Sequence, residues 1–355
     1  MEAYRITQLD GLRGMAAIMV LALHFPLTDS FMTGNFFVRQ SWLFVDFFFV
    51  LSGFIIAKNY YNKIDGWASF KRYIIKRMAR LLPLLYFTVL ICFLYQIIGL
   101  FFGLKTEPQS LSFYLLQTLD SLCFLNSTTL LGDSQGMNPP SWSISAEMIS
   151  YVVFPLGMMI FDKRKFIAVI LIVAFCVLFM IVKDDFAFQN GDYGFVRGLL
   201  GFNLGILTYM ISENKSFRTN VLEFPAVILI LLAFYMTYNY KGDFRNVQYV
   251  ILPFVFSIVI FVFRFGTGFV SKVLNSRMLQ MLGRLSYSIY LNHYLVLLIV
   301  YQISFNILRI ESSEFNISLI LLLSIIIVVV VSKVTYEYIE MKIGERIRSI
   351  LLRRP

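Results

Sequence analysis

The chain has 355 residues, of which 58% are hydrophobic and only 15% are charged. A soluble globular protein carries roughly 25% charged residues, so this composition excludes an ordinary soluble domain and predicts an all-α polytopic integral membrane protein. The formal net charge of +10 does not indicate a nucleic-acid-binding protein, because the basic residues stand in short clusters between apolar runs rather than in one patch.

The apolar runs predict about ten transmembrane helices. A helix needs about 20 mostly apolar residues to cross the hydrocarbon core of a bilayer. Ten segments pass this test, at about 11–27, 41–57, 81–104, 142–161, 166–182, 194–211, 225–239, 247–263, 285–308 and 316–335. Between the third and the fourth, residues 111–125 are amphipathic, and we expect them to lie in the interface or against the bundle.

The distribution of Lys and Arg predicts that both chain termini are cytoplasmic. With the N-terminus inside, 24 of the 31 basic residues fall in cytoplasmic segments and six in outer loops, while Arg197 lies within a span. Cytoplasmic loops of membrane proteins are enriched in Lys and Arg in this way. We expect residues 1–340 to form one transmembrane domain and residues 341–355 to form a basic cytoplasmic tail on the anionic inner leaflet.

Ionisable residues within the spans are the first candidates for function, because charge inside a membrane is costly. Arg13 and His24 lie eleven residues apart in the first span, hence on one helix face and ~16 Å apart along its axis. Asp46 and Glu147 each lie about two turns inside the outer boundary, where they could meet His24. A carboxylate beside a histidine raises its basicity, as a general base requires. Anchoring, ion-pairing and packing roles remain open for each of them.

Other polar residues in or near the spans are also candidates. Arg77 and Arg80 share a helix face at the inner end of the third span, where they would act either as topology markers or as a phosphate clamp. Arg197 lies on the outer side, where positive charge is otherwise scarce, which favours a functional role. His293 lies near mid-bilayer, with packing and function both open. The three cysteines lack the spacing of a metal site or a disulfide framework, and we expect neither.

Several motifs, in order along the chain, resemble the membrane-bound acyltransferase family 3, whose bacterial members acylate surface glycans and other acceptors. The segments that carry the resemblance are Leu9–Gly14 with His24, Asp46–Phe54, Arg77 and Arg80 before Leu81–Pro83, Trp142–Ser143 with Glu147, Arg197 with Phe202 and Gly205, and Leu285–Leu291 with His293. Together they cover about residues 5–345. Some members also carry an extracellular SGNH-type esterase domain, and we expect the membrane domain alone here.

The resemblance implies ten core helices, acyl-CoA as the donor and an acceptor hydroxyl reached from outside. It implies roles for six charged residues: His24 as catalytic base, Arg13, Arg77 and Arg80 at the CoA side, and Glu147 and Arg197 in the acceptor or catalytic pocket. We add Asp46 to the catalytic candidates, and Trp142, Ser143 and His293 to the candidates for acceptor or oxyanion binding. No metal ligand is expected.

The sequence thus predicts an O-acyltransferase of the bacterial cytoplasmic (inner) membrane that moves an acyl group, by our expectation acetyl, from acyl-CoA to a hydroxyl of a cell-surface or lipid-linked glycan. Its partners would be membrane lipid, the glycan, and acyl-CoA as a co-substrate rather than a bound cofactor. In this hypothesis the CoA phosphates stay at the inner arginines, the pantetheine arm reaches His24, and Glu147 rather than Asp46 orients the imidazole. The alternative is a transporter of a small anion or metabolite that uses the same buried charges.

Overall fold

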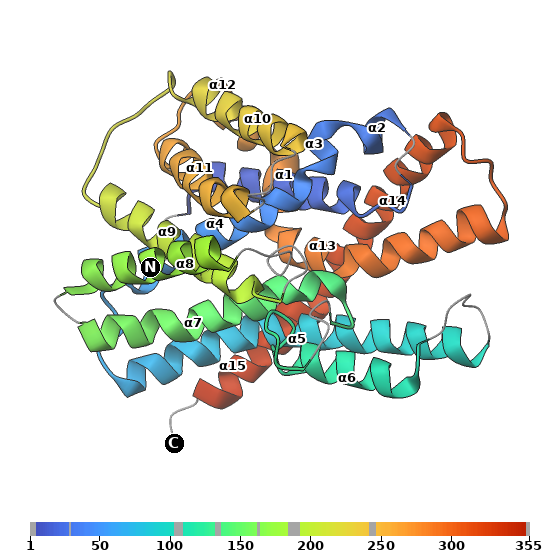
Figure 1. Cartoon of the computed structure of the whole chain (residues 1–355), viewed down its shortest axis with the longest axis horizontal. Helices are drawn as coiled ribbons and strands as arrows, with labels where there is room; N and C mark the ends of the chain where they lie inside the picture. The colour runs from blue at the N-terminus through green and yellow to red at the C-terminus, as the bar shows by residue number, and fades with distance from the viewer. Residues whose placement is uncertain are drawn as a thin grey trace.

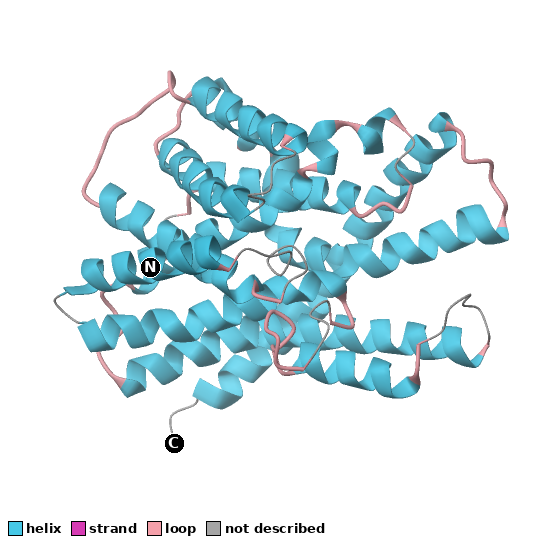
Figure 2. Cartoon of the chain, viewed as in Figure 1, coloured by secondary structure: helices cyan, strands magenta, loops and turns pink. Residues whose placement is uncertain are grey.

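The computed structural model describes residues 5–27, 30–102, 109–131, 136–161, 164–183, 192–240 and 246–352. Within these ranges the secondary structure is helical, and the only extended pairing there is an isolated bridge between Thr219 and Gly266 (Figure 2). The long helices run roughly along one axis of the molecule (Figure 1). Both chain ends lie in the left half of that view, whereas the turn from α13 to α14 lies at the right-hand end.

In the part of the chain that the structure describes, a long helix overlaps each of the ten predicted spans. These helices are α1 (Thr7–Leu23), α4 (Phe44–Tyr60), α5 (Trp67–Phe101), α7 (Trp142–Phe161), α8 (Lys165–Val182), α9 (Gly194–Ser212), α10 (Glu223–Asn239), α11 (Asn246–Arg264), α13 (Arg277–Tyr301) and α14 (Glu314–Thr335). In the described part of the chain, eight helices are long and apolar enough to cross a membrane. Of the other two, α10 is apolar but shorter, and α1, with 17 residues, does not meet the criteria of length and hydropathy. The prediction of an all-helical polytopic membrane protein is confirmed; which side of the membrane the termini occupy stays a prediction.

Shorter helices connect or extend the long ones. They are α2 (Phe31–Gly34), α3 (Phe36–Arg39), η1 (Ser41–Leu43), α6 (Leu111–Leu122), η2 (Pro139–Ser141), α12 (Phe269–Leu274), η5 (Gln302–Ile307), η6 (Tyr336–Ile343) and α15 (Gly344–Leu352). The amphipathic segment expected at 111–125 is α6, which packs against α5. The π-helix η6 joins α14 to α15, so the C-terminal part of the chain is one nearly continuous helical run.

Two of the long helices begin well before the apolar windows that predicted them. α5 begins at Trp67 rather than at 81, and α13 begins at Arg277 rather than at 285. The preceding residues mix basic and polar side chains with apolar ones, so hydropathy marks where the continuously apolar segment starts, while the helix itself extends beyond it. In α5 this extension carries Arg77 and Arg80, which are therefore held on a rigid element.

α9 is the central helix of the bundle and packs against α4, α7, α8 and α11. Of its apolar window 83% is buried, against 28% for α8, which therefore faces outward. Small residues let α4 and α9 approach closely: a Cβ on Gly205 would lie 2.0 Å from the Val50 carbonyl oxygen, and one on Gly53 would lie 1.8 Å from that of Phe202. Close packing through small residues is the usual way in which membrane helices associate.

Of the stretch expected as a basic tail, residues 341–352 are helical and belong to η6 and α15, and both of these elements pack against α5. Pro83 lacks an N–H group, so it cannot bond the carbonyl four residues earlier in the helix, at Ala79. Gly344, the first residue of α15, meets α5 at this carbonyl: a Cβ there would lie 2.5 Å from the Ala79 oxygen. A proline in the sequence thus marks the place where the last helix docks.

Candidate active site

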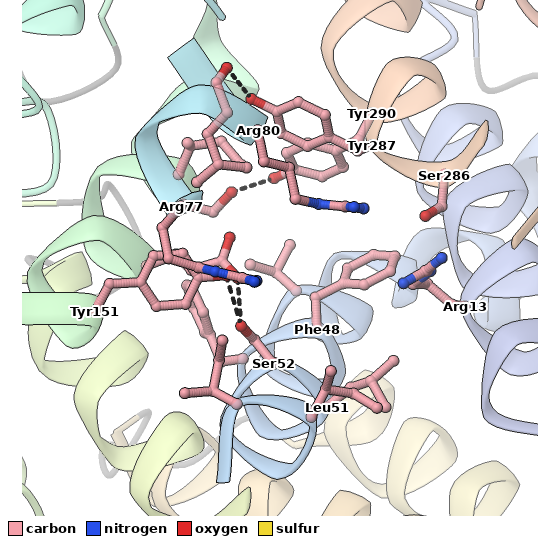
Figure 3. Close-up of a pocket in the computed structure, with 18 of the residues that line it drawn as sticks. Arg13, Phe48, Leu51, Ser52, Arg77, Arg80, Tyr151, Ser286, Tyr287 and Tyr290 are labelled. Atoms are coloured by element: carbon pink, nitrogen blue, oxygen red, sulfur yellow. Dashed lines mark hydrogen bonds between the residues drawn. The ribbon is translucent and has the colours of Figure 1, made fainter. Parts of the chain in front are cut away.

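A cavity of about 350 Å³ runs through the bundle, lined by residues of α1, α4, α5, α7 and α13. Its lining follows α4 from Val45 to Asn59. At 1.5 Å per residue these fourteen steps correspond to ~21 Å of helix, so the cavity is elongated. The side chains that project into it are drawn in Figure 3.

Three arginines line this cavity: Arg13 from α1, and Arg77 and Arg80 from α5. In Figure 3 the guanidinium of Arg13 faces those of Arg77 and Arg80 from the opposite side. Arg13 donates from Nε to the Gly283 carbonyl oxygen at 2.9 Å. The sequence placed these arginines at the inner end of two different spans, and the structure brings them together around one space.

The ion pairs of Arg13 and Arg80 are long, and Arg77 bonds a neutral hydroxyl group. Arg13 lies 3.4 Å from Asp10, and Arg80 lies 3.8 Å from Glu340. Arg77 donates from Nη2 to the Tyr60 hydroxyl at 3.3 Å and lies over its ring. Because guanidinium groups bind phosphate oxygens well, this end of the cavity suits a phosphorylated ligand.

Glu147 lies in the middle of the cavity with two hydroxyl groups. It accepts hydrogen bonds from Ser52 and, at 2.5 Å, from Tyr151, and these two hydroxyls lie 3.1 Å apart. All three side chains line the cavity. Tyr151 follows Glu147 by one helical turn in α7, and Ser52 reaches them from α4. Because both hydroxyl protons are donated to Glu147, the cluster offers acceptor oxygens to the N–H groups of an elongated ligand.

At the other end of the cavity Tyr290 separates the space from two histidines. Its hydroxyl hydrogen-bonds Ser143 at 2.9 Å. Its ring lies 6.0 Å from that of Phe48 and 5.8 Å from that of His293, measured between centroids. Tyr290 and Ser143 line the cavity, whereas His293 lies directly behind Tyr290 and is fully buried.

His24 and His293 form a hydrogen-bonded pair between α1 and α13. Nδ1 of His24 lies 3.3 Å from Nε2 of His293 and 2.8 Å from the Val20 carbonyl oxygen, while Nδ1 of His293 lies 3.2 Å from that of Ile289. A carbonyl oxygen can only accept, so both neutral rings are assigned a proton on Nδ1. His24 then shares that proton between Val20 and His293, and its own Nε2 keeps an unprotonated lone pair.

The expectation that a carboxylate orients His24 is wrong. Asp46 instead pairs with Arg197 at 2.8 Å, and Glu147 accepts from the hydroxyls described above. These residues stand at similar depths but on helix faces that turn toward different neighbours, Asp46 toward α9 and Glu147 toward α4. The partner of His24 is His293, which the sequence proposed for the acceptor or oxyanion.

Arg197 and its neighbours form a closed cluster outside the cavity lining. The side chains of Arg197 and Asp46 are 2% and 0% exposed. The rings of Trp42, Trp142 and Tyr249 surround the guanidinium, with centroids at 5.6, 5.3 and 4.4 Å. The structure therefore places Arg197 and Trp142 outside the lining of this cavity; that they face the acceptor stays a prediction. Of the residues predicted for the acceptor, Ser143 lines the cavity.

Six polar lining residues were not among the predicted ones: Ser52, Asn59, Tyr151, Ser286, Tyr287 and Tyr290. Tyr287 donates to the Leu81 carbonyl oxygen at 2.8 Å and so ties α13 to α5. The one local signal was the spacing of Tyr151, four residues after Glu147, which puts both on one helix face. Four of the others lie in the motifs quoted above but are of types common in membrane helices, and Asn59 lies outside those motifs.

Comparison with known proteins tests the resemblance over nearly the whole chain. The model of a family described as "Acyltransferase domain" (acyltransferase family 3) matches residues 6–336. The chain belongs to this acyltransferase family. The match contains every predicted site residue, and the family resemblance of the motifs is confirmed.

Relatives of this acyltransferase include proteins named for O-acetylation. YrhL of Bacillus subtilis (strain 168), whose name assigns it provisionally to peptidoglycan O-acetylation, is 25% identical over 325 residues, which cover 83% of this chain and 49% of YrhL. The O-acetyltransferase OatA of Staphylococcus aureus (strain NCTC 8325 / PS 47) is 23% identical over 320 residues, covering 82% of this chain and 50% of OatA. The chain spans about half the length of these relatives. No solved structure matches it.

Proposed function

We propose that this acyltransferase moves an acetyl group from acetyl-CoA to a hydroxyl of a cell-envelope glycan, in the cytoplasmic (inner) membrane of a bacterium. The observation that carries the proposal is the elongated cavity, which begins at three arginines and ends at a tyrosine whose ring lies beside His293, one member of the histidine pair. The arginines suit the phosphates of CoA. The names of the relatives support O-acetylation as the reaction class.

The length of the cavity supports CoA as the donor. Its ~21 Å along α4, from the helical rise, is of the order of an extended pantetheine arm. With the phosphates at Arg77 and Arg80, the arm would pass the Glu147 cluster, whose hydroxyls and carboxylate can hydrogen-bond its amide groups. The thioester would then lie near Tyr290. Because basic residues favour the cytoplasmic side, the arginine end faces the compartment that supplies CoA.

His24 supplies the base in this proposal. Its Nε2 accepts the proton of the acceptor hydroxyl as the oxygen attacks the thioester carbonyl. The new C–O bond forms, the C–S bond breaks, and the departing CoA sulfur takes up the proton from His24. General-base catalysis of this kind contributes roughly 10²- to 10⁴-fold to a rate.

His293 acts as a positioning residue for His24. Its own proton is directed to the Ile289 carbonyl oxygen, so its Nε2 is an acceptor for the Nδ1 proton of His24. This contact, together with Val20, holds His24 in the tautomer whose Nε2 can accept a proton. It performs the task for which the sequence suggested a carboxylate.

The test is acetyl transfer from radiolabelled acetyl-CoA to cell-envelope glycan, comparing membranes that hold wild-type protein with membranes that hold His24→Ala at equal, folded amounts. We expect label in the glycan and release of CoA thiol only with wild type. Equal labelling in the two samples would remove His24 from the reaction. A transporter would release no CoA thiol under any of these conditions, and that result would overturn the proposed activity.

A further inference from the structure

A second cavity, of about 260 Å³, lies between α5 and the helical run of η6 and α15. Arg77 and Arg80 line both this cavity and the first one. The two spaces therefore border the same two side chains, which form the junction between them. A ligand held in the first cavity by its phosphates would continue into the second.

The lining of the second cavity carries a surplus of positive charge. Four of its side chains are cationic, Lys76, Arg77, Arg80 and Arg348, and two are carboxylates, Glu340 and Glu345. One carboxylate is partly engaged: Oε2 of Glu340 accepts a hydrogen bond from Ser288 of α13 at 2.8 Å, and its Oε1 lies 3.8 Å from Arg80. The cavity is thus suited to an anion with more than one negative group.

A buried donor at the junction lacks a partner. Nε of Arg77 is buried and has no hydrogen-bond acceptor among the residues that the structure describes. Its Nη2 bonds only a neutral hydroxyl, that of Tyr60. An unsatisfied buried donor is costly, and a phosphate at the junction would satisfy it.

We propose that the second cavity binds the 3′-phosphorylated ADP end of CoA, which makes α15 part of the donor site. The inference rests on the proposed function and extends it to new residues. The diphosphate lies at Arg77 and Arg80, and the 3′-phosphate lies at Lys76 and Arg348. A phospholipid headgroup would enter from the bilayer, whereas the shared arginines suit one ligand that passes from the first space to the second.

A kinetic test compares two donors, acetyl-CoA and acetyl-pantetheine, which lacks the nucleotide and its phosphates. We expect Arg348→Gln and Lys76→Gln to raise KM for acetyl-CoA by about tenfold or more, the loss of one charge-assisted hydrogen bond, and to leave KM for acetyl-pantetheine unchanged. Arg346→Gln is the matched control, because Arg346 lies on α15 but does not line the cavity. An equal change for both donors would overturn the assignment.

A binding test needs no turnover and separates this inference from the proposed function. Adenosine 3′,5′-bisphosphate is titrated into purified protein in a calorimeter. We expect it to bind wild type and Arg346→Gln alike, and Arg348→Gln at least about tenfold more weakly. If it binds in this way but no acetyl transfer occurs, the nucleotide site stands and the proposed activity fails. If wild type and Arg348→Gln bind it equally, or neither binds it, the site does not exist.

Discussion

Two arginines inside the helical bundle, Arg197 and Arg77, have opposite surroundings. Arg197 is 2% exposed, pairs with Asp46 at 2.8 Å and is enclosed by aromatic rings. Arg77 borders two cavities, bonds one tyrosine hydroxyl and keeps a buried Nε without a partner in the described chain. The charge of Arg197 is satisfied within the fold and supports packing. The charge of Arg77 is available to an anionic ligand.

The difference teaches that an arginine in a membrane span is evidence of function only once its partners are known. A buried pair that is fully satisfied is a structural device, and breaking it leaves an uncompensated charge. A buried cation beside a cavity has lost its contacts with water, and protein groups replace them only in part. An anionic ligand that supplies the missing contacts is therefore favoured. Four substitutions break or sharpen this contrast, and they follow from the largest expected effect to the smallest.

Asp46→Ala should cause the largest loss of stability, about 3–5 kcal/mol, because it leaves the Arg197 charge buried and unpaired. Thermal unfolding of the purified protein in detergent measures it. The double variant Asp46→Leu with Arg197→Leu should recover part of the loss, since it removes both charges. A melting temperature of Asp46→Ala equal to that of wild type would show that the closed cluster does not support the fold.

His293→Asn should lower kcat by roughly 10- to 100-fold, less than loss of the base itself, with KM for the donor unchanged. Asn can reach only the position of Nδ1, so it cannot accept the His24 proton. His293→Gln places an amide oxygen near the position of Nε2 and should retain most of the activity. If Asn and Gln variants with equal melting temperatures have equal kcat, His293 serves packing and does not position the base.

Arg77→Gln should raise KM for acetyl-CoA by about tenfold, the effect of one charge-assisted hydrogen bond, and should change the melting temperature little. This is the reverse of the pattern expected at Asp46, where stability falls. Steady-state kinetics and thermal unfolding on the same preparation check both quantities. A large loss of stability with unchanged KM would place Arg77 in the same class as Arg197.

Gly344→Ala should have the smallest effect, about 1 kcal/mol at the low end of the range for overpacking. The added Cβ would lie 2.5 Å from the Ala79 oxygen and would push α15 away from α5. Gly157→Ala in α7 is the matched control, because no atom lies within 4 Å of its Cβ position. A lower melting temperature for Gly344→Ala alone, with a modest rise in KM for acetyl-CoA, would tie the docking of α15 to the donor site.

Much of the fold and part of the site could be predicted from the sequence. The ten helices followed from apolar runs, because a span is a local property of about 20 residues. Arg13, Arg77, Arg80, Ser143 and Glu147 were predicted and do line the cavity. The partners of His24 could not be predicted, since depth along a helix can be counted from the sequence whereas the neighbour that each face meets cannot.

The sequence by itself determined the membrane class, the helices, the family and the identity of the charged residues within the bundle. Only the tertiary structure decided which of those charges are satisfied: Asp46 closes on Arg197, His24 meets His293, and Arg77 remains open to two cavities. The physical reason is that composition and period are local, while the rotation of one packed helix against another depends on contacts across the whole bundle, such as those of Gly53 and Gly205 between α4 and α9.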